Sequence, residues 1–188
     1  EESIRAKIKS FIFFSSSEAY QKPHKIPTKE TEELKIPDVF NPRLSYGGSK
    51  IIGELLTVNY LRNTGIKYKI LRPHNVYGPD MGRDHVMPEL IRKIKMKKKE
   101  KKIKIEIFGS GNESRSYIYI LDAVNAIIRV VNKGIDNQIY NIGTNYEITT
   151  KKLILIIGKI LNKKISIISK PLHRGSVSRR CPNVKKLT

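Results

Sequence analysis

The segment FIFFSSSEAY, residues 11–20, decides the fold class of this 188-residue chain. Its first four residues form a continuous apolar run, which is typical of a strand buried on both faces in a parallel sheet. Three serines follow, and they mark the carboxyl end of that strand, where open parallel sheets bind their ligands. We therefore expect a parallel sheet with polar side chains gathered at the end of strand 11–14.

Short apolar runs alternate with longer periodic runs in the rest of the chain. We expect further strands over 68–71, 103–108, 116–120, 138–142 and 165–168. We expect helices over 45–63, 87–98, 122–131 and 149–161, with Gly65 as a C-terminal cap and Thr149 as an N-terminal cap. Residues 21–42 and 72–86 hold many turn-forming residues and are expected to be loops. A strand, a helix and a strand in this order predict a parallel crossover, so the fold class is α/β.

The charge of the chain is strongly positive. Lysine and arginine number 37 against 17 aspartate and glutamate residues, which gives a net charge of +20 at pH 7. Such an excess could serve nucleic-acid binding. However, the densest basic run, residues 92–104, alternates lysines with apolar residues, as on a helix with one buried stripe and a solvated face. It also lacks the aromatic residues that stack on bases. We therefore consider nucleic acid an unlikely partner.

Several classes of protein are excluded by what the sequence lacks. One cysteine cannot build a disulfide scaffold or a cysteine-based zinc site. No apolar run approaches the roughly 18 residues that a membrane helix needs, so we expect no membrane partner. The first residues, EES, are not those of a signal peptide, and the missing methionine suggests that residue 1 is not a natural start. We expect a cytoplasmic protein.

Two groups of residues could suggest further sites. His74 and His85 flank a loop that also holds Asp80 and Asp84, but their spacing fits no standard zinc pattern, so we expect no metal. Cys181 lies beside basic residues, which could lower the pKa of its thiol. Because no paired histidine motif accompanies it, we interpret this thiol as incidental.

The pair Tyr46 and Lys50 carries the sharpest chemical signal. Four residues apart at the start of a helix, the two side chains lie on one face. An ammonium group there favours the phenolate, and so does the positive end of the helix, which would make Tyr46 a proton acceptor for an alcohol. Gly47 and Gly48 between them suggest that something lies close against the helix. A chance pair on a solvated helix remains the alternative, although no other tyrosine here has a lysine four residues on.

Six ordered motifs resemble the NAD-dependent epimerase/dehydratase family, the nucleotide-sugar branch of the extended short-chain dehydrogenases/reductases. They are SSSEAY (15–20), YGGSK (46–50), LRPHNVYGP (71–79), GSGNESRSYIYILDAV (109–124), YNIGT (140–144) and RRCPN (179–183). The resemblance implies a partial, doubly wound Rossmann-like sheet in residues 1–75. A smaller α/β substrate-binding region, partly interleaved with it, would occupy residues 76–188. The family's glycine-rich dinucleotide fingerprint is not in this sequence, so the resemblance is to the C-terminal portion.

The resemblance also assigns roles to individual residues. Tyr46 would be the general base, Ser16 would bind the reacting hydroxyl, and Lys50 would hold the nicotinamide ribose. The implied catalytic set is Ser16, Glu18, Tyr46 and Lys50; the implied NAD-binding set is Ser15, Tyr46, Lys50 and Pro73; and the implied substrate-binding set is Ser16, Asn75, His85, Arg115 and Arg180. The implied partners are a nucleotide-diphosphate sugar and a second copy of the chain in a homodimer.

The exact reaction stays open between several alternatives. We favour 4-epimerisation through a 4-keto sugar. Relatives that act as 4,6-dehydratases commonly carry an Asp-Glu pair where this chain has Ser17 and Glu18, so dehydration is less favoured. Nucleotide-uronate decarboxylases show a Ser-Glu pair at this place. Outside this class, an inactive fragment or a basic nucleic-acid-binding module remain alternatives.

Overall fold

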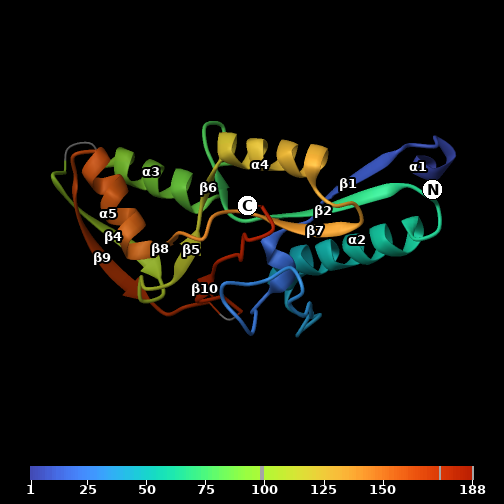
Figure 1. The fold of residues 1–188 in the computed structure, drawn as a ribbon. Coiled ribbons are helices and arrows are strands. Elements are labelled where there is room, and N and C mark those ends of the chain that lie inside the picture. Colours follow the sequence, from blue (N-terminus) through green and yellow to red (C-terminus); the bar gives the residue numbers. More distant parts are fainter. Residues whose placement is uncertain (98–99, 174, 188) are drawn as a thin grey trace.

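The central feature of the fold is a three-stranded parallel sheet between two helices (Figure 1). The computed structural model describes residues 1–97, 100–173 and 175–187. The strand order is β1 (Ser10–Phe14), β2 (Lys67–Pro73), β7 (Gln138–Ile142). Helix α2 (Ser45–Leu61) joins β1 to β2 on one face, and α4 (Ile120–Lys133), which precedes β7, covers the other. Because all three strands are parallel, their carboxyl ends lie at one edge.

A second lobe extends from that edge (Figure 1). Its parallel pair, β4 (Lys102–Phe108) and β9 (Lys164–Lys170), packs under α3 (Val86–Met96) and α5 (Thr150–Ile160). Two small sheets link the lobes: β3 (Val76–Tyr77) with β6 (Ile118–Tyr119), and β10 (Arg179–Arg180) with β5 (Ser114–Ser116) and β8 (Glu147–Thr149). The remaining elements are short: α1 (Glu2–Arg5), η1 (Ser17–Tyr20) and η2 (Pro42–Leu44).

The predicted α/β class and most predicted elements are confirmed, and Thr149 caps α5 by accepting a hydrogen bond from the Lys152 backbone. The single strand expected over 116–120 is wrong, because residues 114–116 pair with β8, 118–119 pair with β3, and the chain then turns into α4. The expected cap at Gly65 is also wrong: α2 ends at Leu61, and Gly65 serves the turn into β2. Residue 98, the last of the helix expected over 87–98, lies outside the described residues.

The prediction that strand 11–14 is buried on both faces is wrong. Residues 11–13 are half-buried, and Phe14 is 49% exposed. The reason is the position of β1 at the edge of the sheet, where it pairs with β2 and with no other described strand. An apolar groove of about 430 Å³ lies beside this edge, between β1, α1 and α2. An open, apolar strand edge of this kind is a surface to which further strands can add.

Each lobe has its own buried core. One core lies under α4 and is formed by Leu71, Ile118, Ala123, Val130, Tyr140 and Ile142. The other fills the second lobe and is formed by Leu90, Ile94, Ile103, Ile105, Ile107, Leu153, Ile154 and Ile157. The division expected between residues 75 and 76 stays a prediction. From the second expected region, strand β7 belongs to the first sheet and helix α4 covers it, while residues 98, 99, 174 and 188 of that region lie outside the described part.

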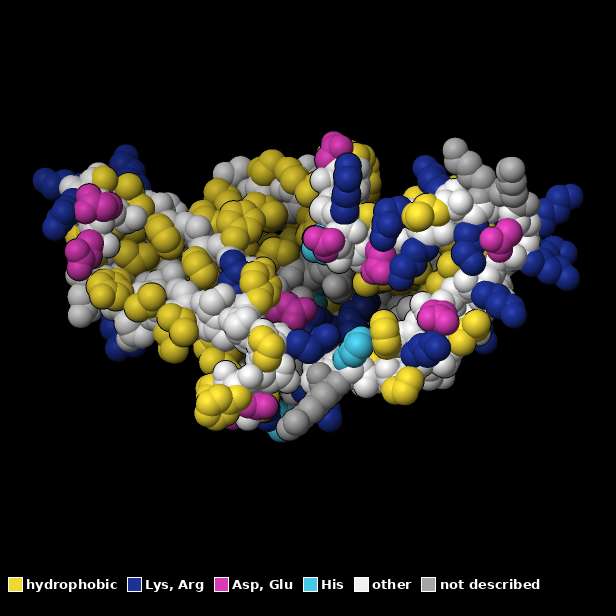
Figure 2. Space-filling view, turned by 180° about the vertical axis from the view of Figure 1, so that it is seen from behind, with side chains coloured by type: hydrophobic (Ala, Val, Ile, Leu, Met, Phe, Trp, Pro, Cys, Tyr) yellow, Lys and Arg dark blue, Asp and Glu magenta, His cyan; other side chains and the backbone are white. Residues whose placement is uncertain are grey.

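The basic run 92–104 forms the solvated surface of the second lobe. Leu90 and Ile94 of α3 are buried, whereas Arg92, Lys93 and Lys95 face solvent, as the periodicity predicts. The end of the run belongs to β4, where Ile103 is buried and its lysine neighbours are exposed. Figure 2 shows lysine and arginine side chains gathered over this lobe. Residues 98 and 99 of the run are outside the described residues.

The core of the second lobe gives a direct stability test. Ile154 in α5 is 0% exposed, while Ile160, six residues further along the same helix, is 72% exposed. We expect Ile154→Ala to lower the free energy of unfolding by about 2–5 kcal/mol, because it leaves a cavity. Ile160→Ala should change it by less than about 0.5 kcal/mol. Urea denaturation measures both, and equal losses would contradict the packing described here.

Candidate functional site

A cavity of about 540 Å³ lies at the carboxyl ends of β1 and β2, at the junction of the two lobes. Its walls come from η1, the start of α2, the segment after β2, the start of α3 and β5. It is lined by Ser16, Ser17, Glu18, Tyr46, Pro73, Asn75, Val76, Met81, His85, Val86, Met87, Arg115 and Tyr117. The structure thus brings together seven residues that the sequence indicated: Ser16, Glu18, Tyr46, Pro73, Asn75, His85 and Arg115.

Tyr46 and Lys50 lie in the first two turns of α2. The Lys50 Nζ is 5.5 Å from the centre of the Tyr46 ring, so the two side chains do share a face. The same Nζ donates a hydrogen bond of 2.9 Å to the backbone oxygen of Phe14, the last residue of β1. Tyr46 is 54% exposed and lines the cavity. The ammonium group therefore lies between Tyr46 and the end of the strand that leads to Ser16.

The two glycines of α2 let the chain itself approach the helix closely. A Cβ on Gly47 would lie 2.6 Å from the backbone oxygen of Glu18 and 2.2 Å from the Gln21 side chain. A Cβ on Gly48 would meet Ile36 at 3.1 Å. Glycine 47 thus allows η1, which carries Glu18, to pack directly on the helix that carries Tyr46.

The serines after β1 point in different directions. The Ser16 Oγ caps η1 by accepting a hydrogen bond from the Glu18 backbone, and Ser16 lines the cavity. The Ser15 hydroxyl is buried and donates to the Glu54 carboxylate at 2.5 Å. Ser15 is not among the residues that line the cavity. The implied role of Ser15 in NAD binding stays a prediction, and its hydroxyl is already engaged in the interior.

Glu18 is held by an arginine from the far end of the chain. Both Arg180 nitrogens Nη1 and Nη2 contact the Glu18 carboxylate, and the Arg180 side chain is almost completely buried. Arg180 does not line the cavity, and its expected role in substrate binding stays a prediction. Its guanidinium fixes the orientation of the Glu18 carboxylate, which does line the cavity.

The other expected substrate residues, Asn75, His85 and Arg115, line the cavity from the segment after β2, the start of α3 and β5. Asn75 donates from its amide to the Ser116 backbone oxygen, and Arg115 donates to the backbone oxygens of residues 114, 177 and 178. Burial, together with the charge of Arg180, lowers the pKa of Arg115 below its usual value. His85 precedes α3 and is exposed. This wall therefore offers positively charged and amide groups to a ligand.

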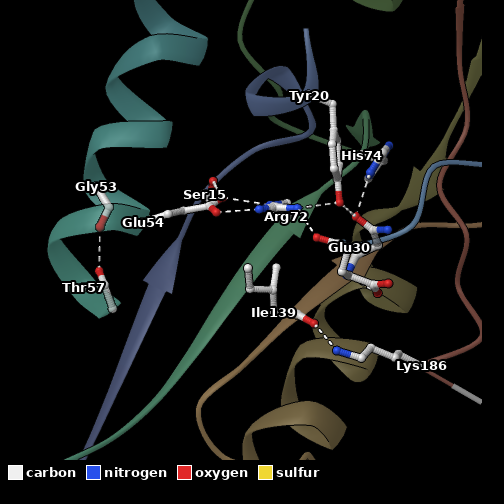
Figure 3. Close-up of polar contacts among 11 residues, drawn as sticks. Ser15, Tyr20, Glu30, Gly53, Glu54, Thr57, Arg72, His74, Ile139 and Lys186 are labelled. Atoms are coloured by element: carbon white, nitrogen blue, oxygen red, sulfur yellow. Dashed lines mark hydrogen bonds and ion pairs between the residues drawn. The ribbon is translucent and has the colours of Figure 1, made fainter. Parts of the chain in front are cut away.

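A buried polar network lies behind the cavity, and sequence reasoning did not find it (Figure 3). Arg72 in β2 is 1% exposed and forms a two-pronged ion pair with Glu54, at 2.8 Å and 2.6 Å. It also donates to the Tyr20 hydroxyl, which donates to Asn141. Burial raises the pKa of Tyr20 to about 12, although Arg72 opposes this. A charged residue inside an apolar strand was the signal that could have indicated a buried pair.

His74 is the most buried ionisable group beside the network. Its side chain is completely buried, and its Nε2 lies 3.3 Å from the Asn141 side-chain oxygen. Burial, and the nearby charges of Arg180 and Arg72, lower its pKa to about 3. This histidine is therefore neutral at physiological pH and is not positioned as a metal ligand. Among the described residues there is no group of three or more metal-binding side chains.

The expectation that basic neighbours lower the pKa of the Cys181 thiol is wrong. The thiol is completely buried, and burial together with the carboxylate of Glu147 raises its pKa to about 11. The basic neighbour Arg179 is paired with Glu147. The cysteine is therefore a structural residue.

No helix in the part of the chain that the structure describes is long and apolar enough to cross a membrane.

Comparison with known families agrees with this geometry. Residues 1–143 match the NAD dependent epimerase/dehydratase family. The chain belongs to the NAD-dependent epimerase/dehydratase family. Its members are NAD-dependent enzymes of the nucleotide-sugar epimerase and dehydratase type, and the Rossmann-like fold predicted from the motifs is confirmed.

Relatives within the family carry out different reactions. The chain is 34% identical over 183 residues to a putative UDP-glucose 4-epimerase of Methanocaldococcus jannaschii, covering 95% of this chain and 56% of that protein. It is 32% identical over 148 residues to the human dTDP-D-glucose 4,6-dehydratase, covering 79% and 39%. The crystal structure of UDP-glucose 4-epimerase with UDP-glucose from Thermotoga maritima superposes with a TM-score of 0.81 at 30% identity, covering 98% and 58%. The chain therefore spans about half the length of these family members.

The family is NAD-dependent, and the resemblance assigns the nicotinamide end of NAD to Tyr46, Lys50 and Pro73. Tyr46 and Pro73 line the cavity, and Lys50 lies beside Tyr46 with its ammonium group close to the end of β1. That these residues bind NAD stays a prediction. The pyrophosphate of a dinucleotide binds a glycine-rich turn at a helix N-terminus, and the sequence holds no such fingerprint.

The buried histidine behind the site predicts a pH dependence of stability. His74 has a folded-state pKa of about 3, below its ordinary value of 6.5, so the unfolded chain binds an extra proton between these values. The contribution of neutral His74 to the free energy of unfolding is therefore fully present above about pH 6.5. Below this pH the free energy of unfolding falls, by about 2 kcal/mol on reaching pH 5. Chemical denaturation at each pH measures this fall. His74→Gln should remove it, whereas exposed His24→Gln should leave it; a slope unchanged in His74→Gln would contradict the assignment.

Proposed function

We propose that the protein carrying this chain is an NAD-dependent nucleotide-sugar 4-epimerase that works through a 4-keto sugar. The observation that supports this most is the placement of Ser16 and Tyr46 on one cavity, with the Lys50 ammonium beside the tyrosine. The 34% identity to a putative UDP-glucose 4-epimerase adds support. Epimerisation also needs fewer groups than dehydration, and Ser17 stands where an additional acid would be required.

In this proposal Tyr46 accepts the proton of the sugar C4 hydroxyl, and Ser16 hydrogen-bonds the same oxygen. Lys50 stabilises the phenolate electrostatically and, with Tyr46 and Pro73, holds the nicotinamide end of NAD. When bound, NAD provides a hydride acceptor that later returns the hydride. Tyr46 then gives its proton back to the C4 oxygen. Epimerisation requires that the keto sugar turn between the two transfers, so that the hydride returns to its other face.

We propose that the nucleotide diphosphate lies along the wall formed by Asn75, His85 and Arg115. Two of these side chains, Asn75 and Arg115, are already fixed by hydrogen bonds to backbone oxygens. Their order reduces the entropy lost on binding. A planar guanidinium is well suited to phosphate oxygens.

Decarboxylation of a nucleotide uronate is the second candidate. It is favoured by one observation, the Glu18 carboxylate that Arg180 holds at the cavity wall. Ser17 and Glu18 at this wall also resemble the Ser-Glu pair of nucleotide-uronate decarboxylases. Proton NMR of the products decides between the two: a C4 epimer of the same mass supports the first, whereas loss of carbon dioxide supports the second.

We also propose that the protein forms a homodimer through α2. Ile52 and Leu55 on this helix are exposed, and Val39, which is 77% exposed, lines a shallow groove together with Ile52. Exposed apolar side chains gathered in this way are typical of an interaction surface. A second copy of the chain is the partner that the family resemblance implies.

The central prediction concerns the phenol of Tyr46. In the complete protein that carries this chain, Tyr46→Phe should lower kcat about 10²- to 10⁴-fold, because the proton acceptor is lost. The melting temperature should stay unchanged, since the side chain is largely exposed. Turnover of UDP-sugars with NAD, followed by NMR, measures the effect.

The matched control is Tyr60→Phe. Tyr60 lies on the same helix and is 55% exposed, but it does not line the cavity. It should keep the wild-type rate. A Tyr46→Phe protein that turns over as fast as the wild type would refute the proposed function.

The proposed dimer predicts a change in mass. Leu55→Glu places a charge on the exposed side of α2 and should convert the dimer to a monomer in light scattering after size-exclusion chromatography. Leu155→Glu, at a similarly exposed position on α5, should leave the dimer intact. A monomeric wild-type protein would contradict this proposal.

A further inference from the structure

We propose that Ser15, Glu54 and Arg72 form a positioning clamp that sets the distance between Tyr46 on α2 and Ser16 at the end of β1. This inference rests on the proposed function for its role in catalysis. None of the three residues lines the cavity. They act through the residues beside them, so they are positioning residues and not catalytic ones.

The clamp joins three elements through one carboxylate (Figure 3). The Glu54 Oε1 accepts from the Ser15 hydroxyl at 2.5 Å and from the Arg72 Nε at 2.8 Å, and the Glu54 Oε2 accepts from the Arg72 Nη2 at 2.6 Å. Glu54 lies on α2, Ser15 follows β1, and Arg72 lies in β2. The side chains are buried, so water does not compete for these bonds.

Each residue of the clamp lies next to a residue of the proposed active site, either in the sequence or one helical turn away. Ser15 precedes Ser16, and Arg72 precedes Pro73. Glu54 lies one helical turn after Lys50. A shift of any clamp residue must therefore move a residue that holds the sugar or the nicotinamide.

Arg72 extends the clamp to η1. Its Nη1 donates to the Tyr20 hydroxyl at 2.8 Å and to the Glu30 backbone oxygen at 3.0 Å. Tyr20 ends the short helix that begins next to Ser16 and carries Glu18. The planar guanidinium thus holds α2 and η1 at once, which a lysine at this position could not do.

Stability alone is a weak reason for this arrangement. Replacing a buried ion pair by well-packed apolar side chains is often neutral or stabilising, because both charges must lose their hydration. A buried pair does, however, impose a single geometry on the groups that it joins. The structure offers a matched comparison in Lys69, also buried in β2, which pairs with Asp136 at the other end of the sheet.

The experiment uses the complete protein and the variants Ser15→Ala, Glu54→Gln and their combination. Each single variant should lower kcat about 10- to 100-fold with KM for the nucleotide sugar and the Kd for NAD changed less than about threefold. The double variant should lose no more than the worse single one, because the residues act as one unit. Lys69→Met, compared well below its melting temperature, should keep the wild-type kcat.

Three results would overturn the clamp. They are wild-type kcat in both single variants, losses that multiply in the double variant, and an equal loss of kcat in Lys69→Met. A selective rise in the Kd for NAD in Ser15→Ala would also overturn it, because it would assign Ser15 to cofactor binding.

Amide hydrogen exchange separates failure of the clamp from failure of the proposed function. Clamp variants should exchange at least about tenfold faster in segments 15–20 and 45–50, while Lys69→Met affects only residues near 69 and 136. If the wild-type protein turns over no nucleotide sugar, the proposed function fails, and the exchange pattern alone decides the clamp. Unchanged exchange in segments 15–20 and 45–50 would then reject it.

Discussion

The buried guanidinium of Arg72 is the constraint on which the rest of the site depends. A charge in the interior must be given hydrogen-bond acceptors on several sides, or the fold pays several kcal/mol for it. Those acceptors come from Glu54 on α2, Tyr20 on η1 and the backbone of residue 30 in the following loop. Three segments that are separate in the sequence are thereby drawn to the carboxyl end of β2. The cavity lies beside this network, and Ser16, Glu18 and Tyr46 from two of these segments line it.

Local signals in the sequence predicted the elements and the main chemical pair. The four-residue spacing of Tyr46 and Lys50 placed both side chains on one helical face, and this is the observed arrangement. The two glycines between them indicated a close approach, and the structure identifies η1 as the segment that approaches. Helix α5 and its cap at Thr149 were also predicted, because a cap and a periodic run are both local.

The features that the sequence did not indicate are contacts between residues far apart in the chain. The apolar run 11–14 does not reveal how many strands flank it, so its burial was overestimated. Glu54 and Arg72 are 18 residues apart in the sequence, and Glu18 and Arg180 are 162 residues apart. Helical or strand periodicity cannot predict a pairing of charges over such separations. The pairing of Arg180 with Glu18 was accordingly not predicted, and the expected role of Arg180 in substrate binding stays a prediction.

The pairing of Glu18 with Arg180 has a consequence for folding. The two residues are 162 positions apart in the sequence, and their contact joins strand β10 to η1. Contacts between segments so far apart close a long loop of chain and form late in folding, whereas the helix with Tyr46 and Lys50 is held by local hydrogen bonds. Assembly of this wall of the cavity is therefore a late step, and a change that weakens β10 would affect it before it affected the central sheet.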